Sequence, residues 1–261
     1  MRLVTYDRGG HRRLGAILGG EVVDLPDAVG HPAFPTTLEA LVSSSGGTVM
    51  DAARAALERD DAYGCAVKRA RVLTPLFPRS LLAPGALDVD RRVLGPEDEV
   101  PWPAGAAWLD YEPMVAAVIG LESSRASADE IREHVFGYTL VNDWKARKAN
   151  GDPVVTAEGV PLAIGPCVVT ADDVNPQTMF VQVRVDGTEV LKGNLNGAAA
   201  SLFELVADAS VDADLARGDA FALDPFTGRN GEPARQLWPG ALVELGAEGI
   251  GTLRNRVAPR D

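Results

Sequence analysis

The sequence predicts an α+β protein that is mainly β, with a rolled or barrel-like β core. Two observations predict this fold class. Short apolar stretches of strand-like composition recur along the 261 residues, separated by turns rich in glycine and proline. Few segments show helical periodicity, so most strands must pair with partners that are distant in sequence. Such strands build a β core flanked by a small number of helices.

The first 75 residues are expected to form a small N-terminal unit. Two helices are predicted in it, one capped by Thr37 and one that begins at Thr48 and runs to Arg59. A single strand is expected over residues 66–73. Three earlier strands are separated by glycine pairs, which supply the positive φ angles of tight hairpin turns: 1–6, 14–18 and 21–24.

Residues 76–261 are expected to form the main domain, after a boundary marked by a proline-rich stretch. A capping box of Ser127 and Glu130 begins one helix, and a second helix is predicted over residues 201–209. Asp186-Gly187 is typical of a hairpin turn. The expected strands are 110–120, 138–143, 162–169, 180–185, 189–191, 221–223, 241–245 and 252–257.

Charge, cysteine content and hydropathy exclude several classes of protein. The net charge of −12 would repel phosphate backbones, so no nucleic-acid partner is expected, although a local arginine cluster can still attract a small anion. Cys65 and Cys167 lie outside any CxxC pattern, which predicts buried thiols in a cytoplasmic protein. No apolar stretch is long enough to span a bilayer and no signal peptide is expected, so no membrane partner is predicted.

Four segments carry a more specific signal when they are taken in order. They are Leu109–Glu112, Phe136–Asp143, Ile164–Pro166 and the closing Glu248–Val257. Together they resemble the fumarylacetoacetate hydrolase family, over about residues 72–257. The resemblance implies a mixed β-sandwich and β-roll in the C-terminal domain, next to a small α/β N-terminal domain. It also implies a homodimer.

Members of this family typically bind Mg²⁺ or Mn²⁺ through carboxylates and act on small molecules. They cleave or rearrange 2-oxo acids and β-dicarbonyl compounds. A divalent cation chelates two oxygens of such a substrate and stabilises the enolate that forms during the reaction. The resemblance therefore implies an enzyme with a carboxylate-bound metal, unless the residues that carry this chemistry are changed.

The metal-binding pattern is the first that is changed. The family's Glu-x-Glu places two carboxylates on one side of a strand, whereas this chain has Glu112-Pro113-Met114. The thioether of Met114 is a soft ligand that Mg²⁺ does not favour. Asp143 corresponds to the third carboxylate ligand. Glu112 and Asp143 are thus the expected metal ligands and catalytic carboxylates, with weakened or lost binding of Mg²⁺ or Mn²⁺.

A family lysine that faces the substrate carboxylate is also replaced. Alignment on the Gly165-Pro166 landmark places Thr156 at its position, and a threonine carries no positive charge. Lys145 and Lys148 follow Asp143 closely in the sequence. One interpretation is that Lys145 compensates for the lost lysine as a catalytic residue. The other is that both lysines lie on an exposed helix face.

Two further loops depart from the family pattern. A His–Glu pair of the active-site lid falls on Arg91 and Leu94, so no histidine is placed as a general base. A Thr-Gly-Thr-Pro loop reads Leu223–Phe226, which offers the carboxylate of Asp224 and an aromatic ring. Asn150 takes the place of a substrate-binding glutamine. Asp224 is expected to act in catalysis, and the residues expected to contact the substrate are Arg91, Met114, Asn150, Thr156 and Phe226.

Three functional hypotheses remain open on the sequence. The first is a metal-linked enzyme of the family that keeps Glu112 and Asp143 and acts on an enolisable 2-oxo acid or β-dicarbonyl compound. The second is a repurposed, metal-free enzyme that catalyses isomerisation, dehydration or cyclisation through its remaining acid–base groups. The third is a non-catalytic paralogue that binds a small ligand or a partner subunit.

Overall fold

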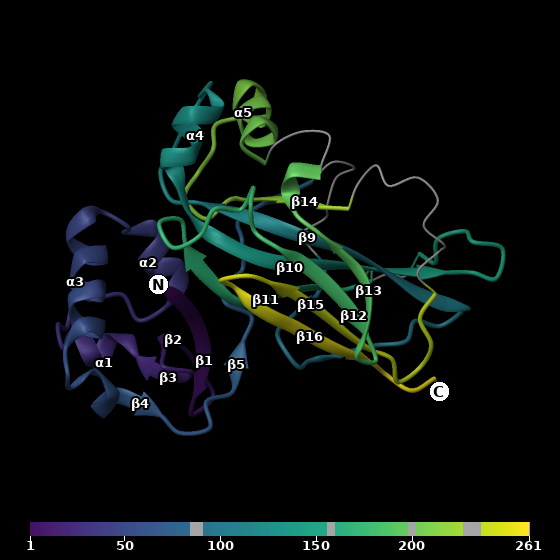
Figure 1. Cartoon of the computed structure of the whole chain (residues 1–261), viewed down its shortest axis with the longest axis horizontal. Coiled ribbons are helices and arrows are strands. Elements are labelled where there is room, and N and C mark those ends of the chain that lie inside the picture. Colours follow the sequence, from purple (N-terminus) through teal and green to yellow (C-terminus); the bar gives the residue numbers. More distant parts are fainter. Residues whose placement is uncertain (84–90, 156–159, 198–201, 227–235, 261) are drawn as a thin grey trace.

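The computed structural model describes residues 1–83, 91–155, 160–197, 202–226 and 236–260. Its strands form two open sheets that pack face to face, with helices at the periphery (Figure 1). The expected mainly-β fold with few helices is therefore confirmed. The core is a pair of open sheets and not a closed barrel.

The larger sheet has eleven strands in the order β4-β3-β2-β1-β11-β10-β9-β14-β6, with β5 paired to β1 and β7 paired to β11. Its strands are β1 (Arg2–Arg8), β2 (His11–Leu18), β3 (Glu21–Asp24), β4 (Ala66–Val67), β5 (Val72–Leu73), β6 (Leu81–Leu82), β7 (Val93–Leu94), β9 (Trp108–Ile119), β10 (Val135–Arg147), β11 (Leu162–Thr170) and β14 (Ala220–Leu223).

The smaller sheet has five strands in the order β13-β12-β15-β16-β8. Its strands are β8 (Glu99–Val100), β12 (Val181–Val185), β13 (Thr188–Gly193), β15 (Leu242–Ala247) and β16 (Gly251–Val257). The predicted hairpin turn joins β12 to β13, and both of its residues have positive φ angles, 48° at Asp186 and 80° at Gly187. This combination matches the right-handed twist of the two flanking strands.

Alternation of side chains along each strand divides the apolar residues between the two faces of the large sheet. Val115 of β9 and Leu140 of β10 face the smaller sheet and join the main core. The other face packs on the N-terminal helices, where Val118 and Val168 join their cluster. Farther along β9 and β10, this second face carries a smaller apolar cluster around Met114, Val141 and Leu162.

Five α-helices cover the sheets, and within the described residues none is long and apolar enough to cross a membrane. Three of them lie beside the N-terminal strands, and α4 and α5 lie together at another edge of the molecule (Figure 1). The helices are α1 (Leu25–Val29), α2 (Leu38–Ser43), α3 (Gly47–Glu58), α4 (Ala128–His134) and α5 (Leu202–Asp212), with two short 3-10 turns at Ala62–Cys65 and Leu195–Gly197.

Most predicted elements are confirmed, including the Thr37 cap of α2 and the capping box of α4. Two predictions were wrong in detail, and one short helix was missed. The helix expected from Thr48 has its N-cap at Gly46. The strand expected over 66–73 is two short strands, β4 and β5, which pair with different partners, β3 and β1. Helix α1 was missed because its five residues are too few to show helical periodicity.

The predicted boundary at residue 75 stays a prediction. The large sheet runs across it without interruption, because β1 pairs antiparallel with β11, and Arg2 lies opposite Val169.

A buried ionic network ties the N-terminal strands to α1. Asp24 is 2% exposed and accepts hydrogen bonds from Arg13 and the Tyr6 hydroxyl.

Candidate active site

Four charged side chains meet on the face of the large sheet that points away from the smaller sheet. Asp143 on β10 lies directly opposite Glu112 on β9 in the strand register. Arg91 Nη2 donates a hydrogen bond to Asp143 Oδ1 at 2.7 Å. The Lys145 ammonium donates to Asp143 Oδ2 and lies 3.7 Å from Glu112 Oε2. Each oxygen of the Asp143 carboxylate is thus held by a different cation. We call these four residues the charged cluster.

Strand geometry explains why the cluster forms. β10 extends four residues beyond the predicted end at Asp143, to Arg147, and residues two apart on a strand face the same side. Lys145 therefore lies on a strand next to Asp143, and the helix-surface interpretation of this lysine was wrong. Arg91 is placed by β7, in which Val93 pairs with Leu162 of β11, itself the partner of Asp143.

The four side chains of the cluster differ in how deeply they are buried, and this limits the roles that each can have. The Asp143 side chain is 0% exposed and Arg91 is 14% exposed, whereas Lys145 is 31% and Glu112 is 43% exposed. A buried carboxylate is stable when charge-assisted hydrogen bonds satisfy it, as Arg91 and Lys145 do here. Glu112 and Lys145 are the members of the cluster that a small molecule from solution can contact most easily.

A cavity of about 210 Å³ opens beside the cluster, where the end of β10 faces Pro153–Val155 and Val160. Its charged lining residues in the described chain are all basic: Arg91, Lys145 and Arg147. Apolar side chains such as Val160 form the rest of the wall. Three basic groups around a small, partly apolar cavity favour an anionic ligand such as a carboxylate.

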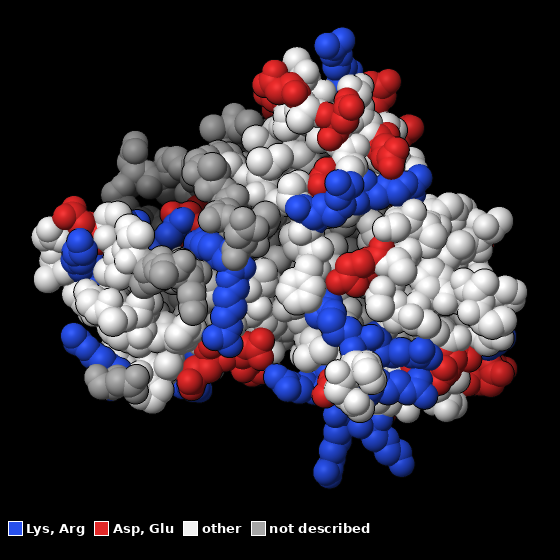
Figure 2. Space-filling model, turned by 180° about the vertical axis from the view of Figure 1, so that it is seen from behind, with Lys and Arg blue, Asp and Glu red and all other residues white. Residues whose placement is uncertain are grey.

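The sign of charge at this cavity differs from that of the chain as a whole. Acidic side chains gather over the edge formed by α4 and α5, at the top of Figure 2, while basic side chains are frequent lower on the same face. The net charge of −12 is therefore unevenly spread, and local residues decide which ligands the cavity attracts.

The residues present do not fit a tightly bound Mg²⁺ or Mn²⁺ ion. Such ions prefer several oxygen ligands, whereas the charged cluster, as far as the chain is described, offers the two carboxylates of Glu112 and Asp143, and Asp143 already binds two cations. Met114 faces the same side of β9 as Glu112 but is 4% exposed and packs in the apolar cluster with Val141. Across the described residues, no three His, Cys, Asp or Glu side chains are grouped as metal ligands would be.

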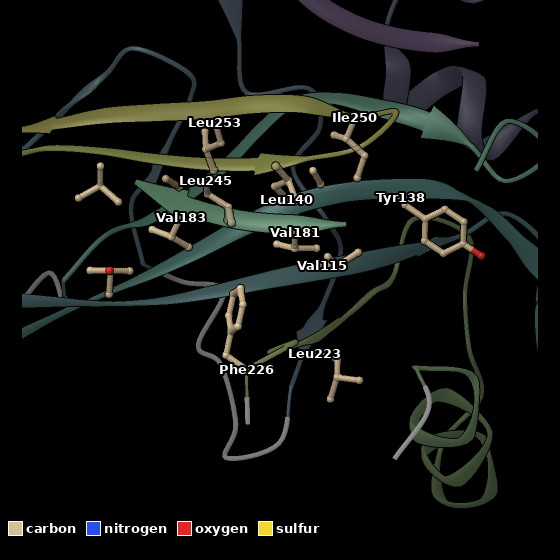
Figure 3. Close-up of a cluster of buried hydrophobic side chains, with 14 of the residues drawn as sticks. Val115, Tyr138, Leu140, Val181, Val183, Leu223, Phe226, Leu245, Ile250 and Leu253 are labelled. Carbon is tan, nitrogen blue, oxygen red and sulfur yellow. The ribbon is translucent and has the colours of Figure 1, made fainter. Parts of the chain in front are cut away.

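Phe226 lies in a different part of the molecule from Met114. Its ring is 3% exposed and belongs to the main core between the two sheets, together with Val115, Val183 and Leu223 (Figure 3). Met114 belongs to the cluster on the opposite face of the large sheet. These positions give Phe226 a packing role, and its contact with a substrate stays a prediction.

The other predicted site residues are spread over loops. Asp224 follows β14, and its Oδ1 accepts a hydrogen bond from the backbone N–H of Phe226 at 2.7 Å, which stabilises the turn. Asn150 is exposed in the turn after β10 and donates a hydrogen bond to Asp152 at 2.8 Å. Thr156 lies outside the described residues.

Sequence reasoning missed two features of the site. It named Arg91 from an alignment of loops but contained no signal that its guanidinium contacts Asp143, because that contact joins residues 52 positions apart. It also did not place Arg147 in the site, whereas Arg147 lines the cavity. The alternation of Lys145 and Arg147 after Asp143 is the pattern from which one basic strand face was predictable.

Comparisons with known proteins agree with this fold. The family model described as fumarylacetoacetate (FAA) hydrolase C-terminal matches residues 84–258. A 2,4-didehydro-3-deoxy-L-rhamnonate hydrolase from Sphingomonas sp. (strain SKA58) is 29% identical over 99% of this chain and 96% of its own length. The oxaloacetate tautomerase YisK from Bacillus subtilis (strain 168) is 31% identical over 57% of this chain and 52% of its own length.

Solved structures show the same fold. A maleylpyruvate hydrolase from Sphingobium sp. SYK-6 superposes with a TM-score of 0.79 at 23% identity, covering 100% of both chains. The same enzyme in complex with manganese(II) and pyruvate superposes with a TM-score of 0.76 at 22% identity, again over 100% of both chains. Because the family model covers well over half of the sequence, the chain belongs to the fumarylacetoacetate hydrolase family.

Proposed function

We propose that this chain is a divergent enzyme of the family that acts on an enolisable 2-oxo acid or β-dicarbonyl compound. The observation that supports the proposal best is the charged cluster of Arg91, Glu112, Asp143 and Lys145 beside a cavity with basic lining. Hydrolysis of a C–C bond, decarboxylation, isomerisation, dehydration and cyclisation of such compounds share an enol or enolate. A site for any of them must stabilise negative charge on the carbonyl oxygen.

Basic side chains supply that stabilisation in this proposal. The cavity takes the substrate carboxylate between Arg91 and Arg147, and the Lys145 ammonium faces the oxygen on which enolate charge develops. A positive charge in a partly buried site stabilises an enolate more strongly than the same charge in water. Asp143, which is 0% exposed, acts as a positioning residue that holds Arg91 and Lys145.

Glu112 is the proposed general base. Its side chain is 43% exposed and lies 3.7 Å from Lys145, so it can reach a substrate that also contacts the ammonium. In this role Glu112 removes a proton from the carbon next to the carbonyl group and delivers it to the enolate oxygen, which gives the enol; the reverse sequence converts the enol to the keto form. Keto–enol isomerisation is the simplest reaction that these two residues can complete. The name of the tautomerase relative is consistent with this choice.

Enzymatic turnover under chelating conditions tests the proposal. The purified protein is treated with a metal chelator and mixed with oxaloacetate or an acylpyruvate, and the ultraviolet absorbance of the enol is followed. We expect turnover by the wild-type protein, a loss of about 100-fold in Glu112→Gln, and no change in Glu122→Gln. Glu122 is exposed and serves as a matched control.

A second candidate is the non-catalytic paralogue. The charge pairing favours it, because Arg91 and Lys145 already neutralise Asp143 and part of the charge of Glu112. Calorimetric titration with pyruvate separates the two functions. Binding of pyruvate together with no turnover of any oxo acid would support the paralogue. The homodimer and the cytoplasmic location also stay proposals, and light scattering of the purified protein tests the first of them.

A further inference from the structure

Lys145 lies between the two carboxylates that a bound metal ion would share. Asp143 and Glu112 are direct neighbours across β9 and β10, and a cation shared by them must lie between their side chains. The Lys145 ammonium occupies this position, because it contacts Asp143 Oδ2 and lies 3.7 Å from Glu112 Oε2. The pair of acids thus has a positive charge supplied by the chain itself.

The second carboxylate oxygen of Asp143 is occupied as well. Arg91 Nη2 lies 2.7 Å from Oδ1, and the Arg91 side chain is 14% exposed. With Lys145 and Arg91 against Glu112 and Asp143, the formal charge of the cluster is zero. A divalent cation would add two positive charges next to two existing ones, and repulsion between like charges at such distances is strong in a partly buried site.

Glu112 has two neighbours on the same face of β9, Met114 and Asp110. Asp110 lies opposite Lys145 in the strand register, and in the described part of the chain it is not grouped with Glu112 and Asp143 as a third metal ligand. Met114 is 4% exposed and packs against Val141 and Leu162. A thioether does not compete for Mg²⁺ or Mn²⁺ with water or carboxylate oxygens. Within the described residues, the cluster therefore offers such an ion two carboxylates, and each of them already faces a cation of the chain.

We infer that the Lys145 ammonium is a built-in counter-ion that takes the place of the divalent cation, so that the site binds neither Mg²⁺ nor Mn²⁺ in the wild-type chain. The inference rests on the proposed function only in treating the charged cluster as the active site. It assigns Lys145 a double role, as the group that excludes a metal and as the positive charge that faces the substrate.

Titration with Mn²⁺, followed by electron paramagnetic resonance of the free ion, tests the inference without any need for turnover. The proteins compared are the wild type, Lys145→Ser, and Lys148→Ser as a matched control, since Lys148 is an exposed lysine three residues farther along. A fourth protein combines Lys145→Ser with Met114→Glu. The second substitution adds a carboxylate on the same face of β9 as Glu112.

We expect no saturable Mn²⁺ binding in the wild type or in Lys148→Ser. Lys145→Ser should show saturable Mn²⁺ binding, at least about tenfold tighter than the weakest binding that the titration of the wild type could detect, because one like charge is removed from the site. The double variant should bind more tightly still. Circular dichroism and thermal melting establish that each variant is folded, and the comparison of Lys145→Ser with wild type stands even where the double variant does not fold.

Two results would overturn the inference. One is saturable Mn²⁺ binding by the wild-type protein. The other is a folded Lys145→Ser protein that takes up no more Mn²⁺ than Lys148→Ser. The proposed function fails separately, through an absence of turnover, which leaves these binding results unchanged.

Discussion

Lys145 and Asp143 lie two residues apart on β10, and the lysine ammonium donates a hydrogen bond to a carboxylate that is 0% exposed. Strand alternation places both side chains on one face. This contact, with Arg91 on the other carboxylate oxygen, makes Asp143 the centre of the charged cluster. Its removal should affect stability as well as function.

Replacing Asp143 by asparagine should lower the free energy of unfolding by about 3 kcal/mol, because Arg91 and Lys145 lose a buried charged partner. Urea unfolding at neutral pH measures this change. Asp214 is exposed, so Asp214→Asn is the matched control and should change stability by less than about 0.5 kcal/mol. Equal effects of the two substitutions would contradict a buried, doubly paired Asp143.

Replacing Lys145 by methionine should lower kcat/KM for an oxo acid by about 100-fold, because the positive charge that faces the developing enolate is lost. Steady-state kinetics with the substrate identified in the chelated assay provide the measurement. Lys148→Met should leave the kinetics unchanged. If Lys145→Met has the same kcat/KM as wild type, the ammonium plays no part in the reaction.

The Asp24 network should make stability depend on pH. Burial by itself would raise the pKa of Asp24, but hydrogen bonds from Arg13, Tyr6 and the backbone of Asp27 outweigh it and hold the pKa below its usual 3.8. A carboxylate whose pKa is lower in the folded state than in the unfolded chain stabilises the fold at pH values above the unfolded pKa. This stabilisation is lost as the pH falls through the pKa of the folded state.

Asp24→Asn should therefore destabilise the protein by about 3 kcal/mol at pH 7. The difference from wild type should shrink below about pH 4, where the unfolded carboxyl group takes up a proton. Urea unfolding of both proteins at several pH values checks the prediction. A difference that stays constant down to about pH 2 would show that the charge of Asp24 is not its source.

Replacing Phe226 by alanine should cost about 3–5 kcal/mol of stability, because it leaves a cavity in the core between the two sheets. Phe180 is 47% exposed, so Phe180→Ala is the control and should cost far less. Thermal or urea unfolding of the Phe226→Ala and Phe180→Ala proteins measures the two losses of stability. A Phe226→Ala protein with unchanged stability and a raised KM would instead support the substrate contact predicted from the sequence.

The two cysteines should differ in reactivity. Burial raises the pKa of the Cys167 thiol to about 12, and Cys167 is 0% exposed, whereas Cys65 is partly exposed. Because the thiolate is the reactive form, a thiol reagent should modify one cysteine in the native protein and both after unfolding. Rapid modification of two thiols in the native state would contradict the burial of Cys167.

Much of the fold was predictable from local pattern. Strand composition and paired turn residues located β2, β3, β12 and β13, and the Ser127–Glu130 capping box placed the start of α4. These features depend on residues that are close in sequence. The short helix α1 and the division of residues 66–73 into β4 and β5 escaped prediction, because both depend on packing and pairing with distant strands.

For the site, the sequence by itself determined which chemical groups are available: carboxylates at Glu112 and Asp143, a thioether at Met114 and a basic residue at Lys145. Strand periodicity was also enough to place Glu112 and Met114 on one face. Only the tertiary structure decided how the charges are paired. Arg91 reaches Asp143 through the pairing of β7 with β11, and a contact between segments 52 residues apart is set by the register of the whole sheet, which no local pattern encodes.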